Sequence, residues 1–213
     1  MEISWEEGRY LLENIIKDYG LPLRVETFWD RLWIYLRALA ERAEELNLTA
    51  VKTIRERLCS QVFEALVMAS RLPSGAFPLA DLGTGGGIPG LILKLARPEV
   101  EVTLYEAYPP RVAFLKEVIR ELSLAGICAE VLHLGKSWPD RRFPVVVARG
   151  YGSVQKFTKH AKRLLSSPGV AFYLWRNDAE PWGGDLCLPL LERVEFELPQ
   201  SQDLRTLLCF RSS

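Results

Sequence analysis

The sequence predicts an α/β protein: a doubly wound, mainly parallel sheet with a helical cap before it and an antiparallel hairpin after it. Three observations lead to this fold class. Strand-like and helical segments alternate from residue 77 to residue 175, as in sheets whose parallel strands are joined by right-handed helical crossovers. Three amphipathic helical stretches precede this region. Two segments of alternating hydrophobicity follow it, which gives seven expected strands in all.

Residues 1–72 predict the helical cap. Apolar side chains recur at helical spacing in residues 5–17 and 25–46; they are Leu11, Leu12, Ile15 and Ile16 in the first helix and Phe28, Leu32, Tyr35, Leu36 and Leu39 in the second. A third helix is expected over residues 54–70, with Leu58, Val62, Ala65 and Leu66 facing inward. These stripes need a partner surface and are too short for a separate core. We therefore expect a cap over residues 1–72, a core over residues 73–213, and a linker at residues 73–78.

The core alternates as a doubly wound sheet should. Strands are expected at residues 77–82, 102–105, 127–132, 144–148 and 170–175, with helices at residues 89–95, 109–122 and 153–165 between them. Ser153 is a preferred N-cap for the last of these helices. Residues 190–198 and 204–210 are separated only by the polar segment 199–203. They are expected to form a hairpin that adds antiparallel pairing at the sheet edge.

Composition limits the class of protein. The chain has 213 residues, 48% hydrophobic and 25% charged, which is enough for one substantial core. No apolar run approaches the roughly 20 residues of a membrane span, and the first residues lack a targeting pattern. We expect a soluble, cytoplasmic monomer with no membrane partner. The four cysteines lie far apart, so we expect them to be buried as small apolar residues and expect no metal site.

Charge is distributed unevenly along the chain. The net charge is +0, yet residues 106–176 hold 12 Lys and Arg against 5 Asp and Glu, and residues 177–213 hold 3 against 7. A basic middle region would suit a nucleic-acid partner. Solvated helix faces would account equally well for Lys116, Arg120, Lys159 and Lys162. Both explanations remain open at this point.

A glycine-rich stretch, residues 79–90 (LADLGTGGGIPG), is the feature around which the rest is organised. It has the pattern of a buried strand, a tight loop and a helix with Pro89 in its first turn. Glycines allow positive φ and let a ligand lie on the main chain, and the helix start offers free N–H groups. A small bound ligand is expected there, with a plain tight turn as the alternative.

Neighbouring residues favour one class of ligand. The Gly-Lys-Ser/Thr of a phosphate loop is absent, and a dinucleotide fingerprint fits only in a shifted register, at Gly85, Gly87 and Gly90. Asp81 would repel a pyrophosphate, but it could hold the ammonium of a methionine moiety directly or through water. Glu106, after the next strand, could accept both ribose hydroxyls. This order favours S-adenosylmethionine over the cofactor of a nucleotide-linked oxidoreductase.

With these residues laid out, the sequence resembles the GidB family (RsmG, glucose-inhibited division protein B). The resemblance is carried by residues 47–51 (NLTAV), the glycine stretch 81–90, Arg97-Pro98, residues 111–115 (RVAFL) and residues 149–151 (RGY). It implies a seven-stranded, Rossmann-like methyltransferase sheet with S-adenosylmethionine as cofactor. It also implies methyl transfer to N7 of a guanine in 16S rRNA, on the RNA or on the 30S ribosomal subunit.

The resemblance and the motif together suggest a set of site residues. Cofactor contacts are expected from Asp81, Gly83, Thr84, Gly85, Gly87, Ile88, Glu106, Ala107, Arg111, Leu134, Gly135 and Arg149. The expected catalytic set is Arg149, Tyr151 and Arg176, without a general base, because N7 of guanine carries a free lone pair. Arg149 could hydrogen-bond guanine O6 or a phosphate, or form a surface salt bridge. Tyr151 could stack on a flipped base or cover the core.

RNA is expected along the ends of the fourth and fifth strands. Arg149, Arg176 and a basic helix would contact it; the helix carries Lys156, Lys159, His160, Lys162 and Arg163. Several positions depart from the family pattern: Gln61 and Glu64 stand where His and Asp are usual, Pro110 replaces the first residue of a Lys/Arg pair, and Gly135, Pro144, Arg176 and Asn177 also differ. These departures leave a divergent, non-catalytic cofactor- or RNA-binding relative as the alternative function.

Overall fold

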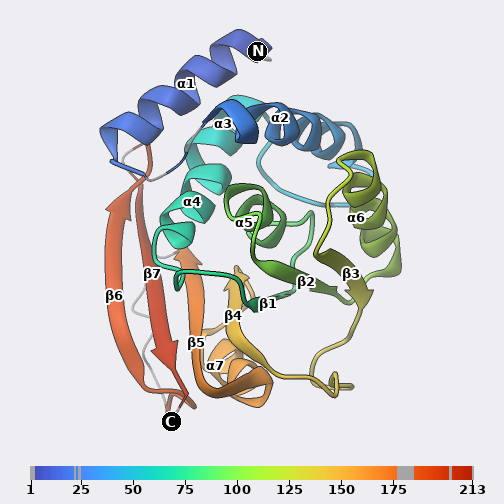
Figure 1. The fold of residues 1–213 in the computed structure, drawn as a ribbon, viewed down its shortest axis with the longest axis vertical. Coiled ribbons are helices and arrows are strands. Elements are labelled where there is room, and N and C mark those ends of the chain that lie inside the picture. The colour runs from blue at the N-terminus through green and yellow to red at the C-terminus, as the bar shows by residue number, and fades with distance from the viewer. Residues whose placement is uncertain (1–2, 22, 24, 177–184, 202, 213) are drawn as a thin grey trace.

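The sheet has seven strands in the order β3-β2-β1-β4-β5-β7-β6. A computed structural model describes residues 3–212 except 22, 24, 177–184 and 202 (Figure 1). The strands are β1 (Pro78–Leu82), β2 (Glu101–Glu106), β3 (Ile127–Val131), β4 (Phe143–Arg149), β5 (Leu165–Arg176), β6 (Leu190–Glu197) and β7 (Leu204–Arg211). β1 to β5 pair in parallel, whereas β7 runs antiparallel to both β5 and β6. The predicted fold class and terminal hairpin are confirmed.

Helices cover both faces of the sheet, as Figure 1 shows. The core helices are α5 (Gly90–Ala96), α6 (Pro109–Glu121) and α7 (Val154–Leu164). α5 and α6 share one hydrophobic cluster with the N-terminal helices, and α7 covers the opposite cluster. On that side Phe157 stacks on Tyr173 with ring centroids 4.6 Å apart. Two buried layers therefore sandwich the sheet, as a doubly wound fold requires.

The N-terminal segment consists of α1 (Trp5–Asp18), α2 (Val25–Arg42), α3 (Ile54–Arg57), a π-helical turn η1 (Leu58–Val62) and α4 (Phe63–Ala69). Ser4 and Thr53 start α1 and α3 with capping boxes. The predicted stripe residues of α2 are buried. The second helix ends at Arg42, earlier than the predicted residue 46, because the chain turns and Asn47 takes φ 50°.

The third predicted helix, residues 54–70, forms as a continuous helical stretch with one widened turn, η1. Every residue from Gln61 to Ala69 is buried, including the polar Gln61 and Glu64. A π turn inserts an extra residue and shifts the side chains that follow it, and such turns occur frequently at functional sites. The sequence pattern predicted the helix but not this irregularity.

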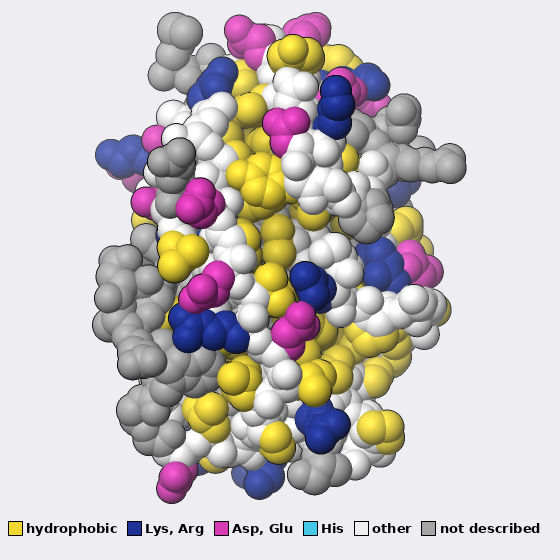
Figure 2. Space-filling view, turned by 90° about the vertical axis from the view of Figure 1, so that its left-hand side faces the viewer, with side chains coloured by type: hydrophobic (Ala, Val, Ile, Leu, Met, Phe, Trp, Pro, Cys, Tyr) yellow, Lys and Arg dark blue, Asp and Glu magenta, His cyan; other side chains and the backbone are white. Residues whose placement is uncertain are grey.

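β6 forms one edge of the sheet. Figure 2 looks onto this side and shows a hydrophobic band with positive and negative side chains distributed over it. Four residues of β6 are charged, Glu192, Arg193, Glu195 and Glu197, and all of them are exposed. Arg71 of the segment after α4 pairs with Glu192 at 2.9 Å. Charged side chains on an edge strand discourage further strand pairing.

The structure tests what the composition predicted about the cysteines. Cys59 and Cys209 are buried as predicted, but Cys128 is exposed and Cys187 half-buried, so the prediction of uniform burial was wrong. Cys128 lies on β3, whose alternation directs every second side chain to solvent. Among the described residues no group of three or more His, Cys, Asp and Glu side chains could hold a metal ion. None of the described helices has the length and apolarity to cross a bilayer.

The strand order changes direction between β1 and β4. β2 and β3 lie to one side of β1, while β4 and β5 lie to the other, so the carboxyl ends of β1 and β4 flank a topological switch point. Ligands of open α/β sheets bind at this crevice. The glycine loop, Glu106, Arg149 and the turn after β4 all lie at that edge of the sheet.

Candidate functional site

The glycine loop begins directly after β1. Gly83 has φ +67°, and the backbone N–H groups of Gly83 and Thr84 both donate to the carbonyl of Tyr105 on β2, at 2.9 and 3.1 Å. A Cβ on Gly83 would lie only 2.7 Å from the ring of Tyr151. Both the left-handed backbone and this close approach require glycine. The loop is therefore attached to β2 and touches the turn that follows β4.

Asp81 is fully buried at the base of the loop. Its Oδ2 accepts hydrogen bonds from Thr84 Oγ1 at 2.6 Å and from the Gly90 N–H at 2.8 Å, while Oδ1 has no partner. The pKa of Asp81 is raised to about 7: burial is the main cause, the two hydrogen bonds oppose the shift, and the charge of Glu106 adds to it. A buried carboxylate oxygen without a partner suits a cationic ligand group.

Glu106 is joined to the glycine loop and to α6. Its Oε2 accepts the Gly85 N–H at 3.0 Å, and its Oε1 accepts the Tyr108 N–H at 3.0 Å and lies 3.8 Å from Arg111 Nη1. Each carboxylate oxygen can accept two hydrogen bonds, so acceptor capacity remains for ligand hydroxyls. Gly85 has φ +58°, and a Cβ on it would lie 3.6 Å from Leu48 O, an ordinary van der Waals contact. These features fit the adenosine and methionine parts of S-adenosylmethionine.

The N-terminal cap rests on the loop. Tyr35 of α2 donates its phenol to the Gly86 carbonyl at 2.9 Å, and a Cβ on Gly86 would meet Leu39 at 2.7 Å. Burial raises the pKa of Tyr35, so this phenol stays protonated and able to donate. Arg111 of α6 donates to the carbonyls of Leu46 and Asn47 at 3.1 and 2.8 Å. The cap is thus hydrogen-bonded to the glycine loop and to α6.

Arg149 closes β4 and is held by a buried carboxylate. Its Nε lies 2.5 Å from Glu64 Oε2 on α4, and Arg205 Nε of β7 lies 3.0 Å from the other oxygen, Glu64 Oε1. The Glu64 side chain is 1% exposed, and those of Arg149 and Arg205 are 15% and 14% exposed. Arg149 therefore forms an ion pair, one of the predicted alternatives, but it does so in the interior beside a pocket.

Tyr151 follows Arg149 and joins an aromatic cluster. Its hydroxyl lies 2.9 Å from His160 Nδ1, and the Trp138 ring packs edge-on against His160. The burial of His160 lowers its pKa, and nearby Lys156 and Lys159 lower it further, so the imidazole is neutral at pH 7. The expectation that His160 belongs to an RNA-facing basic surface was wrong. It occupies the inward stripe of an amphipathic helix.

The remaining predicted residues occupy several places at this edge. Gly135, with φ +98°, lies where a Cβ would be 3.8 Å from His160, and Leu134 precedes it in the same turn. Thr84 and Ile88 are buried in the loop, Gly87 has φ +105°, and Ala107 is exposed after β2. Arg176 is the last residue of β5, in register with Arg205; its side chain and Asn177 lie outside the described part of the chain.

Sequence reasoning missed Tyr35 and Arg205 as site residues. A signal for the buried polar network was present in the third helix, because Arg57, Gln61 and Glu64 recur at helical spacing directly beside the residues predicted to face inward. In the structure Arg57 donates to the Val51 carbonyl at 3.0 Å and Gln61 donates to Thr49 at 2.7 Å. Polar residues on a core-facing stripe therefore indicated contacts with the segment that covers the glycine loop.

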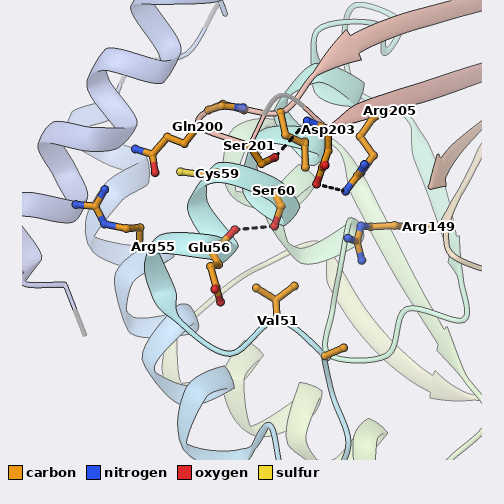
Figure 3. A pocket seen from close by; sticks show the side chains of 13 residues that line it. Val51, Arg55, Glu56, Cys59, Ser60, Arg149, Gln200, Ser201, Asp203 and Arg205 are labelled. Atoms are coloured by element: carbon orange, nitrogen blue, oxygen red, sulfur yellow. Dashed lines mark hydrogen bonds and ion pairs between the residues drawn. The ribbon is translucent and has the colours of Figure 1, made fainter. Parts of the chain in front are cut away.

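A pocket of about 460 Å³ opens beside Arg149. Its walls come from the segment before η1, from η1 itself and from the β6–β7 turn, as Figure 3 shows; the lining residues are Ala50, Val51, Arg55, Glu56, Cys59, Ser60, Arg149, Leu198, Pro199, Gln200, Ser201, Asp203 and Arg205. The pocket and the glycine loop are linked through the turn after β4: Arg149 lines the pocket, and Tyr151, two residues later, lies beside Gly83. A second ligand could therefore lie next to a bound cofactor.

Two solved structures that share this fold are methyltransferases. A methyltransferase from Pyrococcus furiosus superimposes with a TM-score of 0.57 at 13% identity, covering 86% of this chain and 98% of that one. The N-methyltransferase NodS from Bradyrhizobium japonicum, solved with S-adenosyl-L-homocysteine, gives a TM-score of 0.52 at 15% identity, covering 87% and 98%. At these identities the likeness establishes the Rossmann-like methyltransferase fold.

Curated relatives carry one name, ribosomal RNA small subunit methyltransferase G. The Methylobacillus flagellatus protein is 28% identical over 159 residues, which cover 75% of this chain and 76% of that protein. The protein of Francisella tularensis subsp. holarctica is 28% identical over 190 residues, covering 89% and 90%. Residues 29–180 match the family described as GidB, rRNA small subunit methyltransferase G. The match spans most of the chain, from α2 to beyond β5, and the chain therefore belongs to the GidB family.

Proposed function

We propose that this protein transfers a methyl group from S-adenosylmethionine to N7 of a guanine in 16S rRNA of the small ribosomal subunit. The observation that supports it most is the hydrogen bond between the Gly85 N–H and the Glu106 carboxylate at the topological switch point. It joins the glycine loop and the ribose acid, with the unpartnered Oδ1 of Asp81 buried at the base of the same loop. The family membership and the relatives' names support the same activity.

The residues present fit the cofactor. Glu106 would accept the ribose hydroxyls, the backbone of Gly85 would lie against the ligand, and Asp81 would face its cationic end. Leu134 and Gly135 would lie near the adenine. When bound, S-adenosylmethionine supplies an electrophilic methyl group on a sulfonium centre. The protein itself provides fixed hydrogen-bond acceptors and a buried region beneath the glycine loop. Together they would hold the methyl donor in one orientation.

Methylation of guanine at N7 does not require the protein to act as a general base. N7 of guanine presents an in-plane lone pair, so no group must remove a proton before transfer. The protein must hold the base in line with the methyl group and stabilise it as positive charge moves onto the purine. Arg149 would hydrogen-bond O6, adjacent to N7, and Tyr151 would pack beside the base. Burial raises the pKa of Tyr151 to about 12, so its hydroxyl stays protonated.

The basic side of α7 would contact the RNA backbone. Lys156, Lys159, Lys162 and Arg163 are exposed on it, opposite the buried Phe157 and Ala161. Binding through phosphates should weaken as salt rises, and loss of one contacting lysine should lower the slope of log affinity against log salt by about one. We further propose that the protein acts as a cytoplasmic monomer, which sedimentation of the purified protein would check.

The test is single-turnover transfer of labelled methyl groups to 30S subunits that lack the modification. Transfer to a single guanine, identified as N7-methylguanine by mass spectrometry of the 16S rRNA, supports the function. Absence of transfer at saturating cofactor to both subunits and free 16S rRNA would favour the non-catalytic alternative. Arg149→Ala should depress the transfer rate far more than RNA affinity if Arg149 holds the base, and both together if it holds a phosphate. Arg120→Ala, an exposed position on α6, is the matched control.

A further inference from the structure

The pocket beside Arg149 has the size and lining of a small-ligand site. Its volume of about 460 Å³ lies within the range of roughly 300–1,000 Å³ typical of such sites. Apolar side chains of Val51, Leu198 and Pro199 line parts of it, while charged side chains from β4, β7 and the β6–β7 turn line another part (Figure 3). This combination suits a flat, polar-edged ring, because its faces need apolar contact and its edge needs hydrogen bonds.

A line of alternating charges fixes the polar side of the pocket. Asp203 Oδ2 lies 3.5 Å from Arg205 Nη2, Arg205 pairs with Glu64, and Glu64 pairs with Arg149. Glu64 is almost wholly buried, so both guanidinium groups are paired with a carboxylate in the protein interior. The Asp203 N–H donates to Ser201 Oγ at 3.3 Å, which fixes the turn. Arg149, a donor, lines the pocket from β4, two residues before the Tyr151 that lies beside Gly83, and Asp203, an acceptor, lines it from the β6–β7 turn.

The edge of guanine presents hydrogen-bonding groups in a matching order. N7 is followed by the acceptor O6, then by the donors N1–H and the 2-amino group. With O6 on Arg149, N7 would face the cofactor loop, and N1–H and the 2-amino group would face a carboxylate. Adenine offers an acceptor at N1, which a carboxylate repels, and inosine lacks the 2-amino donor. Glu56 also lines the pocket, but its carboxylate accepts the Thr53 N–H at 3.1 Å in a capping box.

We propose that the pocket between η1 and the β6–β7 turn receives the target guanine, with Arg149 on O6 and Asp203 accepting N1–H and the 2-amino group. The proposal rests on the proposed function and adds its specificity determinant. Asp203 comes from the antiparallel hairpin, outside both the glycine loop and the strand ends of the parallel sheet. Selection of the base is thereby separated from binding of the cofactor.

The test combines a change in the protein with a change in the base. 30S subunits are reconstituted with 16S rRNA carrying guanosine or inosine at the nucleotide that the wild-type protein methylates. Wild-type protein should prefer guanosine in kcat/KM by about 10- to 100-fold, as for a hydrogen bond to a charged group. In Asp203→Asn and Asp203→Ala the preference should fall to about threefold or less, by the same reasoning. Asp140→Asn, an exposed carboxylate outside the pocket, should keep it.

The possible outcomes distinguish failure of the guanine-pocket proposal from failure of the proposed methyltransferase function. If wild type and the Asp203 variants transfer methyl groups with the same preference for guanosine, the guanine-pocket proposal is wrong and the proposed function is retained. Unchanged S-adenosylhomocysteine affinity, measured by calorimetry, shows that a variant is folded. If no RNA is methylated, the proposed function is rejected. The guanine-pocket proposal is then tested by ligand-observed NMR of the binding of guanosine, inosine and adenosine monophosphates. Tighter binding of the guanosine nucleotide that disappears in Asp203→Asn supports the pocket, and equal binding overturns it.

Discussion

Gly85 donates its backbone N–H to the carboxylate of Glu106 at 3.0 Å, across 21 residues of sequence, so the glycine loop and the end of β2 form one unit. Glu106→Ala should weaken S-adenosylhomocysteine binding by roughly 1–3 kcal/mol, because a charged acceptor is lost from the ligand and from the loop. Isothermal titration measures it. Glu101→Ala, at the exposed start of the same strand, is the control and should bind normally. Equal affinities for the two variants would contradict the assignment.

Gly85→Val should abolish cofactor binding. The residue has φ +58°, a backbone that valine rarely adopts, and a Cβ there would lie 3.6 Å from Leu48 O. The two methyl groups of valine would add bulk to the loop on which we propose that the ligand lies. Gly75→Val is the matched control, with φ +87° and nothing within 4 Å of its Cβ. Both changes place a β-branched side chain on a backbone with positive φ. Only the change at Gly85 should remove binding in the titration.

Asp81 should make stability depend on pH. Its pKa is raised to about 7 by burial, from about 3.9 in an unfolded chain, so the folded state binds the proton more tightly. Its contribution is full below about pH 4 and is lost as pH rises to about 7, by up to about 4 kcal/mol. Urea unfolding of wild type and Asp81→Asn across this range should show a difference in free energy that changes with pH. A constant difference would exclude the shift.

The same group should couple cofactor binding to proton release. A cationic ligand beside Asp81 favours its charged form, so binding near pH 7 should expel a proton. Calorimetric enthalpies measured in buffers of different ionisation enthalpy would detect it. Asp81→Asn should show no such buffer dependence. If the binding enthalpy of the wild-type protein does not depend on the buffer, the cationic group of the ligand does not lie beside Asp81.

Glu64→Ala should destabilise the fold by roughly 3 kcal/mol, because it leaves two mostly buried guanidinium groups, Arg149 and Arg205, without their shared carboxylate. Glu192→Ala breaks the exposed pair with Arg71 and should cost less than about 1 kcal/mol. Chemical denaturation of the two variants makes the comparison. Similar losses would mean that solvent screens the Glu64 network as it does the surface pair.

Removing residues 1–46 should leave an insoluble or molten protein. The cap shares its hydrophobic cluster with α5 and α6, and Tyr35 donates to Gly86. Tyr35→Phe removes that hydrogen bond while keeping the ring, and it should leave cooperative unfolding intact. Circular dichroism melting of both proteins distinguishes them. A cooperatively melting fragment that begins near Asn47 would show that the cap is a separable unit.

Periodicity predicted the strands and most helices, because their hydrophobic patterns are local. The π turn and the early end of α2 were not predictable in this way, since both depend on tertiary packing and on the left-handed Asn47. The glycine loop and Glu106 could be proposed as site residues from the sequence because they follow adjacent strands; the structure shows them hydrogen-bonded to each other. Arg205 was missed, because its partnership with Glu64 joins residues 141 positions apart and depends on where the hairpin docks.

The hydrogen bond from Tyr35 to Gly86 carries a consequence for the order in which a growing chain can fold. α1 and α2 are made before any of the described strands. α1 packs against α2 and η1, but α2 also packs against α5, so part of the apolar stripe of α2 has no partner until the chain has grown past residue 96. Exposed apolar helix faces are open to aggregation and to chaperones during that interval. Completion of the glycine loop depends in turn on the docking of α2, so a nascent chain acquires its ligand site only after its earliest helices have been captured.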